Sequence, residues 1–349
     1  MHYRPGFTHI LRHILRHSLG LSAFRRIVRG LLGMLLVSTL ALAGCAPDSR
    51  ELTRISLPMG YVANVQFAPF YVAKERSAFE EAGYDVTFDY RWETDGVQLV
   101  AAGELPFSVA SGDQVIQARS QGLPVVAVAG WYQRFPVAII ALADTPLETS
   151  EDLRGLRVGI PETFGASYIG LRALLAAADM AESDIDLQVI GYTQLAALTN
   201  NTVDAVVVYA NNEPVVLAQD GTAFNALYVA DYANLVSAVI VSSDAFVAKH
   251  PEEVRRFVGA FLDGLRDVLS NPEEAFEIST AYVEGLEENR AVQWPVLQAS
   301  IELWETPTPG LMDAAAWEQA QEVMLQAGLI EAQVPAEALY TNAFVPDAD

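Results

Sequence analysis

The sequence predicts an α/β protein of two lobes, each a mostly parallel β-sheet flanked by helices, with a ligand cleft between the lobes. Three observations lead to this prediction. Short apolar runs alternate with segments of helical periodicity, which is the pattern of βαβ units and parallel sheets. The alternation restarts near residue 144, so the chain contains two such units. Beyond residue 250 the pattern is nearly all helical, and an apolar run at 236–241 can carry the chain back to the first unit.

The elements of the first unit follow from the period of the apolar residues. Alternation with a period of two indicates a strand, and apolar residues three or four positions apart indicate a helix. Glycines close several of the helical segments, as is typical of helix ends. Strands are expected at 55–59, 86–90, 107–110, 125–129 and 137–143. Helices are expected at 68–82, 97–102 and 113–120.

The second unit shows the same signals and leads into a helical tail. Its strands are expected at 156–160, 187–190 and 205–209, and its helix at 166–178. The helices of the tail are expected at 251–269, 273–283, 291–304 and 312–327. Lobe 1 should therefore comprise residues 54–143 and 242–349, and lobe 2 residues 144–241. Small molecules bind between domains and at the carboxyl ends of parallel strands, so the cleft is the expected binding site.

The N-terminal segment predicts export and a lipid anchor. Residues 1–30 are basic without an acid, and the apolar residues 31–43 are too few to span a bilayer core of ~30 Å. They have the length of the apolar region of a secretory signal. Leu42-Ala43-Gly44-Cys45 resembles the cleavage motif of bacterial lipoproteins, in which the cysteine is acylated. An ordinary signal peptide with an incidental cysteine is the alternative.

The lipoprotein interpretation fixes the expected processing and location. Residues 1–44 would be a signal peptide, and 45–53 would be a tether that holds the protein to the membrane through lipidated Cys45. The protein would then work on the extracytoplasmic face of a bacterial cell membrane. A monomer is expected.

Composition excludes several classes of function. The net charge is −23, and loss of residues 1–44 removes six arginines and no acid, which makes it −29. Such a surface repels nucleic acid, so no nucleic-acid partner is expected. Cys45 is the only cysteine, and His250 is the only histidine beyond the signal segment. Metal sites built from Cys and His, and nucleophile pairs that need a histidine, are therefore excluded. No catalytic residue, metal or cofactor is expected.

Motifs spread over residues 52–270 resemble one known family. Gly60-Tyr61 begins the resemblance, and segments 68–73, 79–86, 103–107, 122–125 and 153–159 continue it in order. Together they resemble the bacterial solute-binding proteins of the thiamine-precursor type. The resemblance implies a two-lobed periplasmic-binding-protein fold, type II-like, that delivers a ligand to the permease of an ABC importer. Ligands of this group include pyrimidine precursors of thiamine, riboflavin, sulfonates and nitrate.

Two segments narrow the expected ligand. Residues 162–168 and 209–214 look most like those of the riboflavin-binding lipoproteins, which implies riboflavin, a neutral flavin, as the transported ligand. A formylaminopyrimidine precursor of thiamine is the alternative within the same class. An enzyme of pyrimidine metabolism on the same fold is a different-class alternative, although the fungal synthases use a histidine and a cysteine-rich motif that this chain lacks. A sensor that docks on a receptor is a further possibility.

Aromatic side chains at the expected strand ends are candidates for stacking on a heteroaromatic ligand. Aromatic pairs gain ~0.5–1.5 kcal/mol beyond the burial of their surface. Ordinary core packing is about as compatible with any one of them, but their position at the starts of loops favours ligand contact. The candidates are Tyr61, Trp92, Tyr132, Tyr168 and Tyr209.

Polar candidates follow the same strands. The loop at 161–168 joins a strand to a helix, so the backbone N–H groups of the loop should point into the cleft. The candidate residues of this loop are Thr163, Gly165 and Ser167. Because the loop has no Arg or Lys, a neutral polar acceptor is favoured over an anion. A helix cap alone is the alternative.

Amide and carboxylate side chains near two strand ends complete the candidate site. Asn211 and Glu213 follow a strongly apolar strand, and Asn64 and Gln66 follow the first strand. Such groups can bind the donor and acceptor edge of a pyrimidine-like ring. For Asn211 and Glu213, capping of the helix that follows is an equally good interpretation.

Overall fold

The computed structural model describes residues 51–346, and the predicted signal segment and lipidated Cys45 lie outside the described residues. β1 begins at Thr53, the last residue of the predicted tether. Within the described range, no helix has both the length and the apolar character needed to cross a bilayer.

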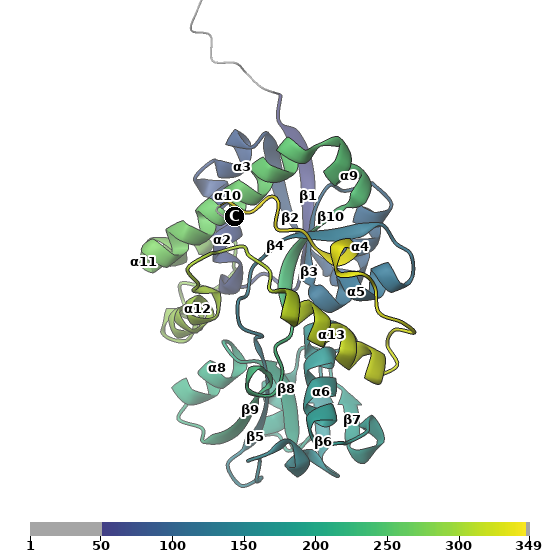
Figure 1. The fold of residues 1–349 in the computed structure, drawn as a ribbon. Helices are drawn as coiled ribbons and strands as arrows, with labels where there is room; N and C mark the ends of the chain where they lie inside the picture. The colour runs from purple at the N-terminus through teal and green to yellow at the C-terminus, as the bar shows by residue number, and fades with distance from the viewer. Residues whose placement is uncertain (1–50, 347–349) are drawn as a thin grey trace, which may run out of the picture. The chain divides into compact units, whose positions relative to one another are not determined.

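The strands form two groups, which we call lobe 1 and lobe 2 (Figure 1). In lobe 1, β1 pairs with β2, and β10 lies between β3 and β4; β1 also contacts β3. In lobe 2 the order is β7-β6-β8-β5-β9. The strands of lobe 1 are β1 (Thr53–Gly60), β2 (Tyr84–Trp92), β3 (Ser108–Ser111), β4 (Val125–Gly130) and β10 (Ala238–Ser243). Those of lobe 2 are β5 (Val137–Leu142), β6 (Arg157–Ile160), β7 (Asp186–Val189), β8 (Ala205–Tyr209) and β9 (Phe224–Tyr228).

Helices flank both groups of strands. Lobe 1 carries η1 (Val65–Phe67), α2 (Ala68–Glu75), α3 (Ala78–Glu81), α4 (Glu93–Ala101), α5 (Gly112–Ser120), α9 (Asp244–Lys249), α10 (Pro251–Ser270), α11 (Pro272–Ser279), α12 (Arg290–Trp304) and α14 (Ala336–Leu339). Lobe 2 carries α6 (Gly165–Ala177), α7 (Gln194–Thr199) and α8 (Glu213–Gln219). α13 (Ala314–Gln326) contacts both α5 and α6, so the helical tail touches both lobes.

The sheets are mixed, which corrects the expectation of mostly parallel sheets. The pairs β1–β2, β6–β7 and β6–β8 are parallel, whereas β5 and β10 pair antiparallel with both of their neighbours. The chain crosses between the lobes twice, and β5 and β10 are the first strands after these two crossovers. Each runs antiparallel to both of its neighbours in the sheet that it joins. Periodicity identifies such a run as a strand but does not show which neighbour it will pair with.

Strand pairing also moves the division between the lobes. The sequence analysis assigned 137–143 to lobe 1, but β5 lies between β8 and β9 of lobe 2. It also divided 236–241 from 242–349, whereas β10 lies wholly in the sheet of lobe 1. The crossovers are therefore the segments 131–136 and 229–237, rather than segments near 143 and 241.

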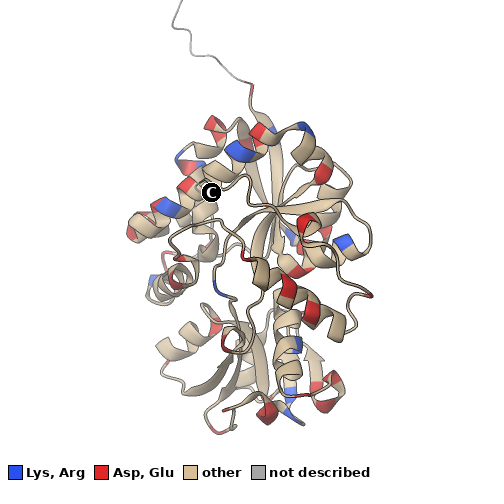
Figure 2. Ribbon diagram, in the orientation of Figure 1, with Lys and Arg blue, Asp and Glu red and all other residues tan. Residues whose placement is uncertain are grey.

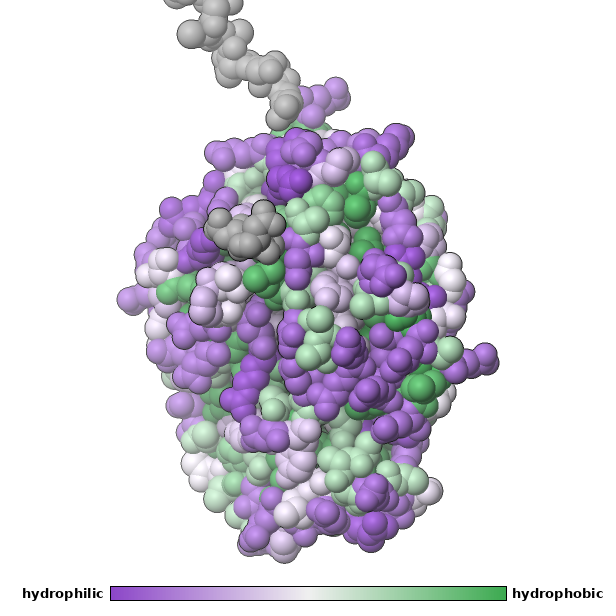
Figure 3. All heavy atoms as spheres, viewed as in Figure 1, coloured by the Kyte–Doolittle hydropathy of each residue, from purple (hydrophilic) through white to green (hydrophobic). Residues whose placement is uncertain are grey.

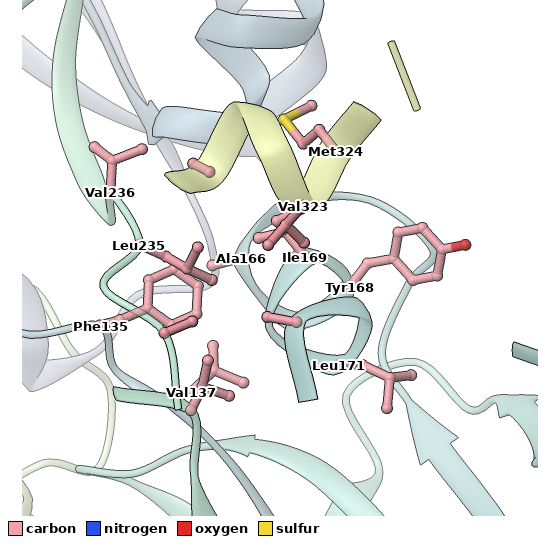
Figure 4. Close-up of a cluster of buried hydrophobic side chains, with 14 of the residues drawn as sticks. Phe135, Val137, Ala166, Tyr168, Ile169, Leu171, Leu235, Val236, Val323 and Met324 are labelled. Atoms are coloured by element: carbon pink, nitrogen blue, oxygen red, sulfur yellow. The ribbon is translucent and has the colours of Figure 1, made fainter. Parts of the chain in front are cut away.

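Apolar packing joins the crossovers to the helices. Phe135 of the first crossover and Leu235 and Val236 of the second lie near Ile169 of α6 and Val323 of α13 (Figure 4). All five side chains belong to one buried cluster. The surface around this core is largely hydrophilic on the face drawn in Figure 3, and acidic residues occur along the ribbon of both lobes (Figure 2).

Candidate functional site

A cavity of about 810 Å³, counting space open to solvent, lies between the two lobes. Its lining combines aromatic and acidic side chains and contains no Lys or Arg. The lining residues are Met59, Gly60, Tyr61, Gln66, Phe67, Trp92, Glu93, Val109, Trp131, Tyr132, Pro161, Glu162, Phe164, Gly165, Ala166, Ser167, Tyr192, Gln194, Tyr209, Asn212, Glu213 and Ala238.

An aromatic pair from opposite lobes covers one edge of this cleft. Trp92, at the end of β2, stacks on Tyr192, which follows β7, with ring centroids 5.6 Å apart and planes at 25°. Tyr61 meets the same Tyr192 ring edge-on at 4.8 Å, and Phe164 meets Trp92 edge-on at 5.7 Å. Trp92 is 45% exposed and Tyr192 is 37% exposed. Exposed aromatic faces that meet at a cavity are suited to stacking on a planar ligand.

Three glutamates, Glu93, Glu162 and Glu213, supply the acidic part of the lining. Burial, together with repulsion by Asp113, raises the pKa of Glu93 to about 8 and that of Glu162 to about 7. Burial also raises the pKa of Glu213 to about 7, although the N–H groups of Glu213 and Tyr209 act in the opposite direction. Near neutral pH these carboxyls can therefore carry a proton, so they can donate as well as accept hydrogen bonds. Glu162 Oε2 is buried and has no hydrogen-bond partner, which leaves an acceptor free for a ligand.

Behind the cleft, Asn211 connects the two lobes. Its Nδ2 donates to Gln66 Oε1 of lobe 1 at 3.0 Å and to Ser300 Oγ of α12 at 2.7 Å. The Tyr132 hydroxyl donates to the same Gln66 oxygen at 3.0 Å. Asn211 is 1% exposed and does not line the cavity. Its amide therefore holds Gln66 and Tyr132 in place instead of lying open to a ligand.

The structure brings most of the predicted site residues together. The ones that line the cavity are Tyr61, Gln66, Trp92, Tyr132, Gly165, Ser167, Tyr209 and Glu213. Whether they contact a ligand stays a prediction.

Four predicted residues lie elsewhere. Asn64 caps η1 by accepting from the Gln66 N–H at 3.0 Å, and Thr163 is exposed outside the lining. Tyr168 lies on the side of α6 away from the cavity, where its hydroxyl donates to Glu182 Oε2 at 2.5 Å. Asn211 lies behind the lining, as described above. A local hydrogen bond determines the position of Asn64, and the phase of the helix determines that of Tyr168.

Sequence reasoning did not select Tyr192, Glu93, Glu162 or Phe164. Tyr192 follows Gly191 at the carboxyl end of β7, and this glycine has a φ of 60°, in the left-handed region that favours glycine. Tyr192 is also one of the aromatic residues at the expected strand ends, and the glycine turn before it was the further signal that could have selected it. Glu93 follows Trp92 directly and could have been selected on the same reasoning.

The fold and this cleft define a two-lobed α/β protein with a cavity between its lobes. The structure of the aliphatic sulphonate binding protein SsuA from Escherichia coli has a TM-score of 0.67 and 16% identity, covering 84% of this chain and 92% of that one. SsuA from Xanthomonas axonopodis pv. citri, bound to MOPS, has a TM-score of 0.63 and 16% identity, covering 85% and 100%. The predicted periplasmic-binding-protein fold is thus confirmed.

Sequence comparison shows the family. Residues 64–275 match the model of the family described as NMT1/THI5 like, and the chain belongs to this family. The riboflavin-binding protein RibY of Chloroflexus aurantiacus is 41% identical over 314 residues, covering 87% of this chain and 90% of the relative. The formylaminopyrimidine-binding protein of Halalkalibacterium halodurans is 29% identical over 322 residues, covering 88% and 97%.

More distant relatives include an enzyme. The 4-amino-5-hydroxymethyl-2-methylpyrimidine phosphate synthase of Legionella pneumophila is 24% identical over 65% of this chain and 72% of its own length. Among residues 51–346, no group of three or more His, Cys, Asp or Glu is placed to hold a metal ion. The resemblance to the solute-binding proteins, and within them to the riboflavin-binding type, is confirmed.

Proposed function

We propose that the protein binds riboflavin in the cleft between its lobes and delivers it to the permease of an ABC importer. The observation that carries this proposal is the aromatic pair Trp92–Tyr192, one ring from each lobe, in the lining of the cavity between the lobes. Because the two rings stack on each other in the structure, a flat fused-ring ligand would stack on both only after the lobes part to admit it and close again, which couples binding to closure. The relative with 41% identity, named as a riboflavin-binding protein, supports the same ligand.

The polar lining supports a neutral ligand that has both donors and acceptors. Glu162 Oε2 is free to accept, and the carboxyls of Glu93 and Glu213 can donate when they carry a proton. Riboflavin offers an imide N–H, ring carbonyls and the hydroxyls of its ribityl chain, so it can satisfy both kinds of partner. The protein acts as a binding protein and not as an enzyme in this proposal, since its described residues include no cysteine and a single histidine, His250, which pairs with Glu253 outside the cavity.

A fluorescence titration tests this function. We expect purified protein to quench riboflavin emission with one-to-one stoichiometry and a Kd in the micromolar range or below, because a stacked flavin loses its emission. A formylaminopyrimidine, the ligand in the name of the relative with 29% identity, serves as the competing ligand. If the protein binds the formylaminopyrimidine and not riboflavin, riboflavin is excluded as the ligand and the thiamine precursor is favoured.

We also propose that Cys45 carries a lipid that holds the protein on the extracytoplasmic face of the membrane. The sequence Leu42-Ala43-Gly44-Cys45 supports this, because it ends an apolar segment of signal-peptide length. We expect labelled palmitate to be incorporated into the wild-type protein in a bacterial host and not into Cys45→Ser. Membrane fractionation is the second readout, and equal membrane retention of the two proteins would contradict the anchor.

A further inference from the structure

The N-termini of α4, α5 and α6 lie close together beside the cleft. Two carboxyl side chains of the protein, those of Glu93 and Asp113, lie at these N-termini. Glu93 is the first residue of α4, and Asp113 is the second residue of α5. α5 contacts both α4 and α6, and α6 begins at Gly165 in the other lobe. Helix N-termini carry partial positive charge and attract anions. Here the anions are side chains of lobe 1 that face a helix of lobe 2.

Asp113 is the most buried of these carboxyls. It is 5% exposed, its Oδ2 accepts from Gln114 Nε2 at 3.0 Å, and its Oδ1 is buried without a hydrogen-bond partner. Burial raises the pKa of Asp113, and nearby groups that include the backbone N–H of Gly165 act against this rise. The carboxyl therefore lies near the start of α6, although Asp113 is not itself part of the cavity lining.

Glu93 reaches the same place from α4. Its Oε2 accepts from Ser111 Oγ at 2.5 Å. A Cβ atom added to Gly165 would lie 3.5 Å from this Glu93 oxygen and 3.8 Å from Ser111 Oγ. The start of α6 is thus covered by side chains of lobe 1, and Glu93 is also part of the cavity lining.

We propose that Asp113 and Glu93 determine specificity by taking the anion position at the start of α6, so that the cleft admits uncharged ligands and rejects anionic ones. This inference rests on the proposed function and narrows its ligand to the flavin without a phosphate. The cavity lining contains no Lys or Arg that could offset an added negative charge. A phosphate monoester brings about −1.5 to −2 charges at neutral pH. In a site of low polarity, repulsion between such charges is stronger than in water.

Riboflavin and its 5′-phosphate, FMN, are the matched pair of probes. The titrations are made at low salt and pH 8.5, above the pKa values of Glu93 and Glu162, so that both carboxyls are mainly ionised. We expect wild-type protein to bind FMN at least about tenfold more weakly than riboflavin. Asp113→Asn and Glu93→Gln should each reduce this ratio severalfold. Asp95→Asn removes the same charge from an exposed position on α4 and should leave the ratio unchanged.

Equal affinity of the wild-type protein for FMN and riboflavin would overturn the proposal, as would a ratio that neither Asp113→Asn nor Glu93→Gln changes. Failure to bind riboflavin would instead reject the proposed function. In that case inorganic phosphate, followed by calorimetry, is the probe. Phosphate binding by the wild-type protein would overturn anion exclusion. So would the absence of phosphate binding from both the wild type and the double variant Asp113→Asn/Glu93→Gln. Phosphate binding by the double variant alone would support the proposal.

Discussion

Trp92→Ala is expected to weaken riboflavin binding by about 30-fold, the free-energy equivalent of about 2 kcal/mol. The indole is 45% exposed in the structure, and a stacked flavin would cover much of that face. At ~25 cal/mol per Å² of apolar surface, together with ~0.5–1.5 kcal/mol for aromatic stacking, a loss of this size follows. Fluorescence titration of the variant measures it directly.

The structure indicates that this substitution affects the site more than the fold. Trp92 makes no side-chain hydrogen bond at the start of α4, and its ring contacts are with the cleft residues Phe164 and Tyr192. Trp92→Phe keeps a ring and should lose less affinity than Trp92→Ala. Tyr228→Ala removes an aromatic ring of similar exposure, 38%, outside the cavity and should bind as the wild type does. An affinity of Trp92→Ala within threefold of wild type would exclude stacking on Trp92.

The residues at strand ends show what periodicity can predict. Tyr61, Trp92 and Tyr209 were selected because they end or follow apolar strands, and all three line the cavity. The prediction succeeds because the direction of a strand and the position of its last residue are local properties. β5 and β10 show the limit, since the sheet that each strand joins depends on contacts with distant segments.

The loop before α6 shows a second limit. Gly165 and Ser167 line the cavity, but Tyr168 faces the opposite side of the helix and donates to Glu182. Successive side chains of a helix point about 100° apart. A shift of one position along the helix therefore decides whether a side chain faces the cleft or packs away from it. The sequence located the loop but not the residue at which the helix begins. Asn211 was placed correctly at a strand end, yet its three possible partners come from distant segments that no local pattern reveals.

Gly264→Ala is expected to destabilise the protein by about 3 kcal/mol, although alanine is the better helix former. Gly264 lies inside α10, where this helix packs on α2. A Cβ atom there would be 2.2 Å from the Pro69 carbonyl oxygen and 2.8 Å from Ala73 Cβ. Neither neighbour is a flexible side chain, so the helices must separate and lose packed surface. Denaturant unfolding of the ligand-free protein measures the loss.

Gly259 provides the matched control on the same helix. No atom lies within 4 Å of a Cβ added at this position, so Gly259→Ala should gain about 0.5–1 kcal/mol from helix propensity. Equal stability of the two variants would show that α10 and α2 can separate without cost. Because α2 directly follows η1, which carries Gln66 of the cleft, separation of these helices should also disturb the site. Gly264→Ala should therefore lose riboflavin affinity together with stability, and Gly259→Ala should lose neither.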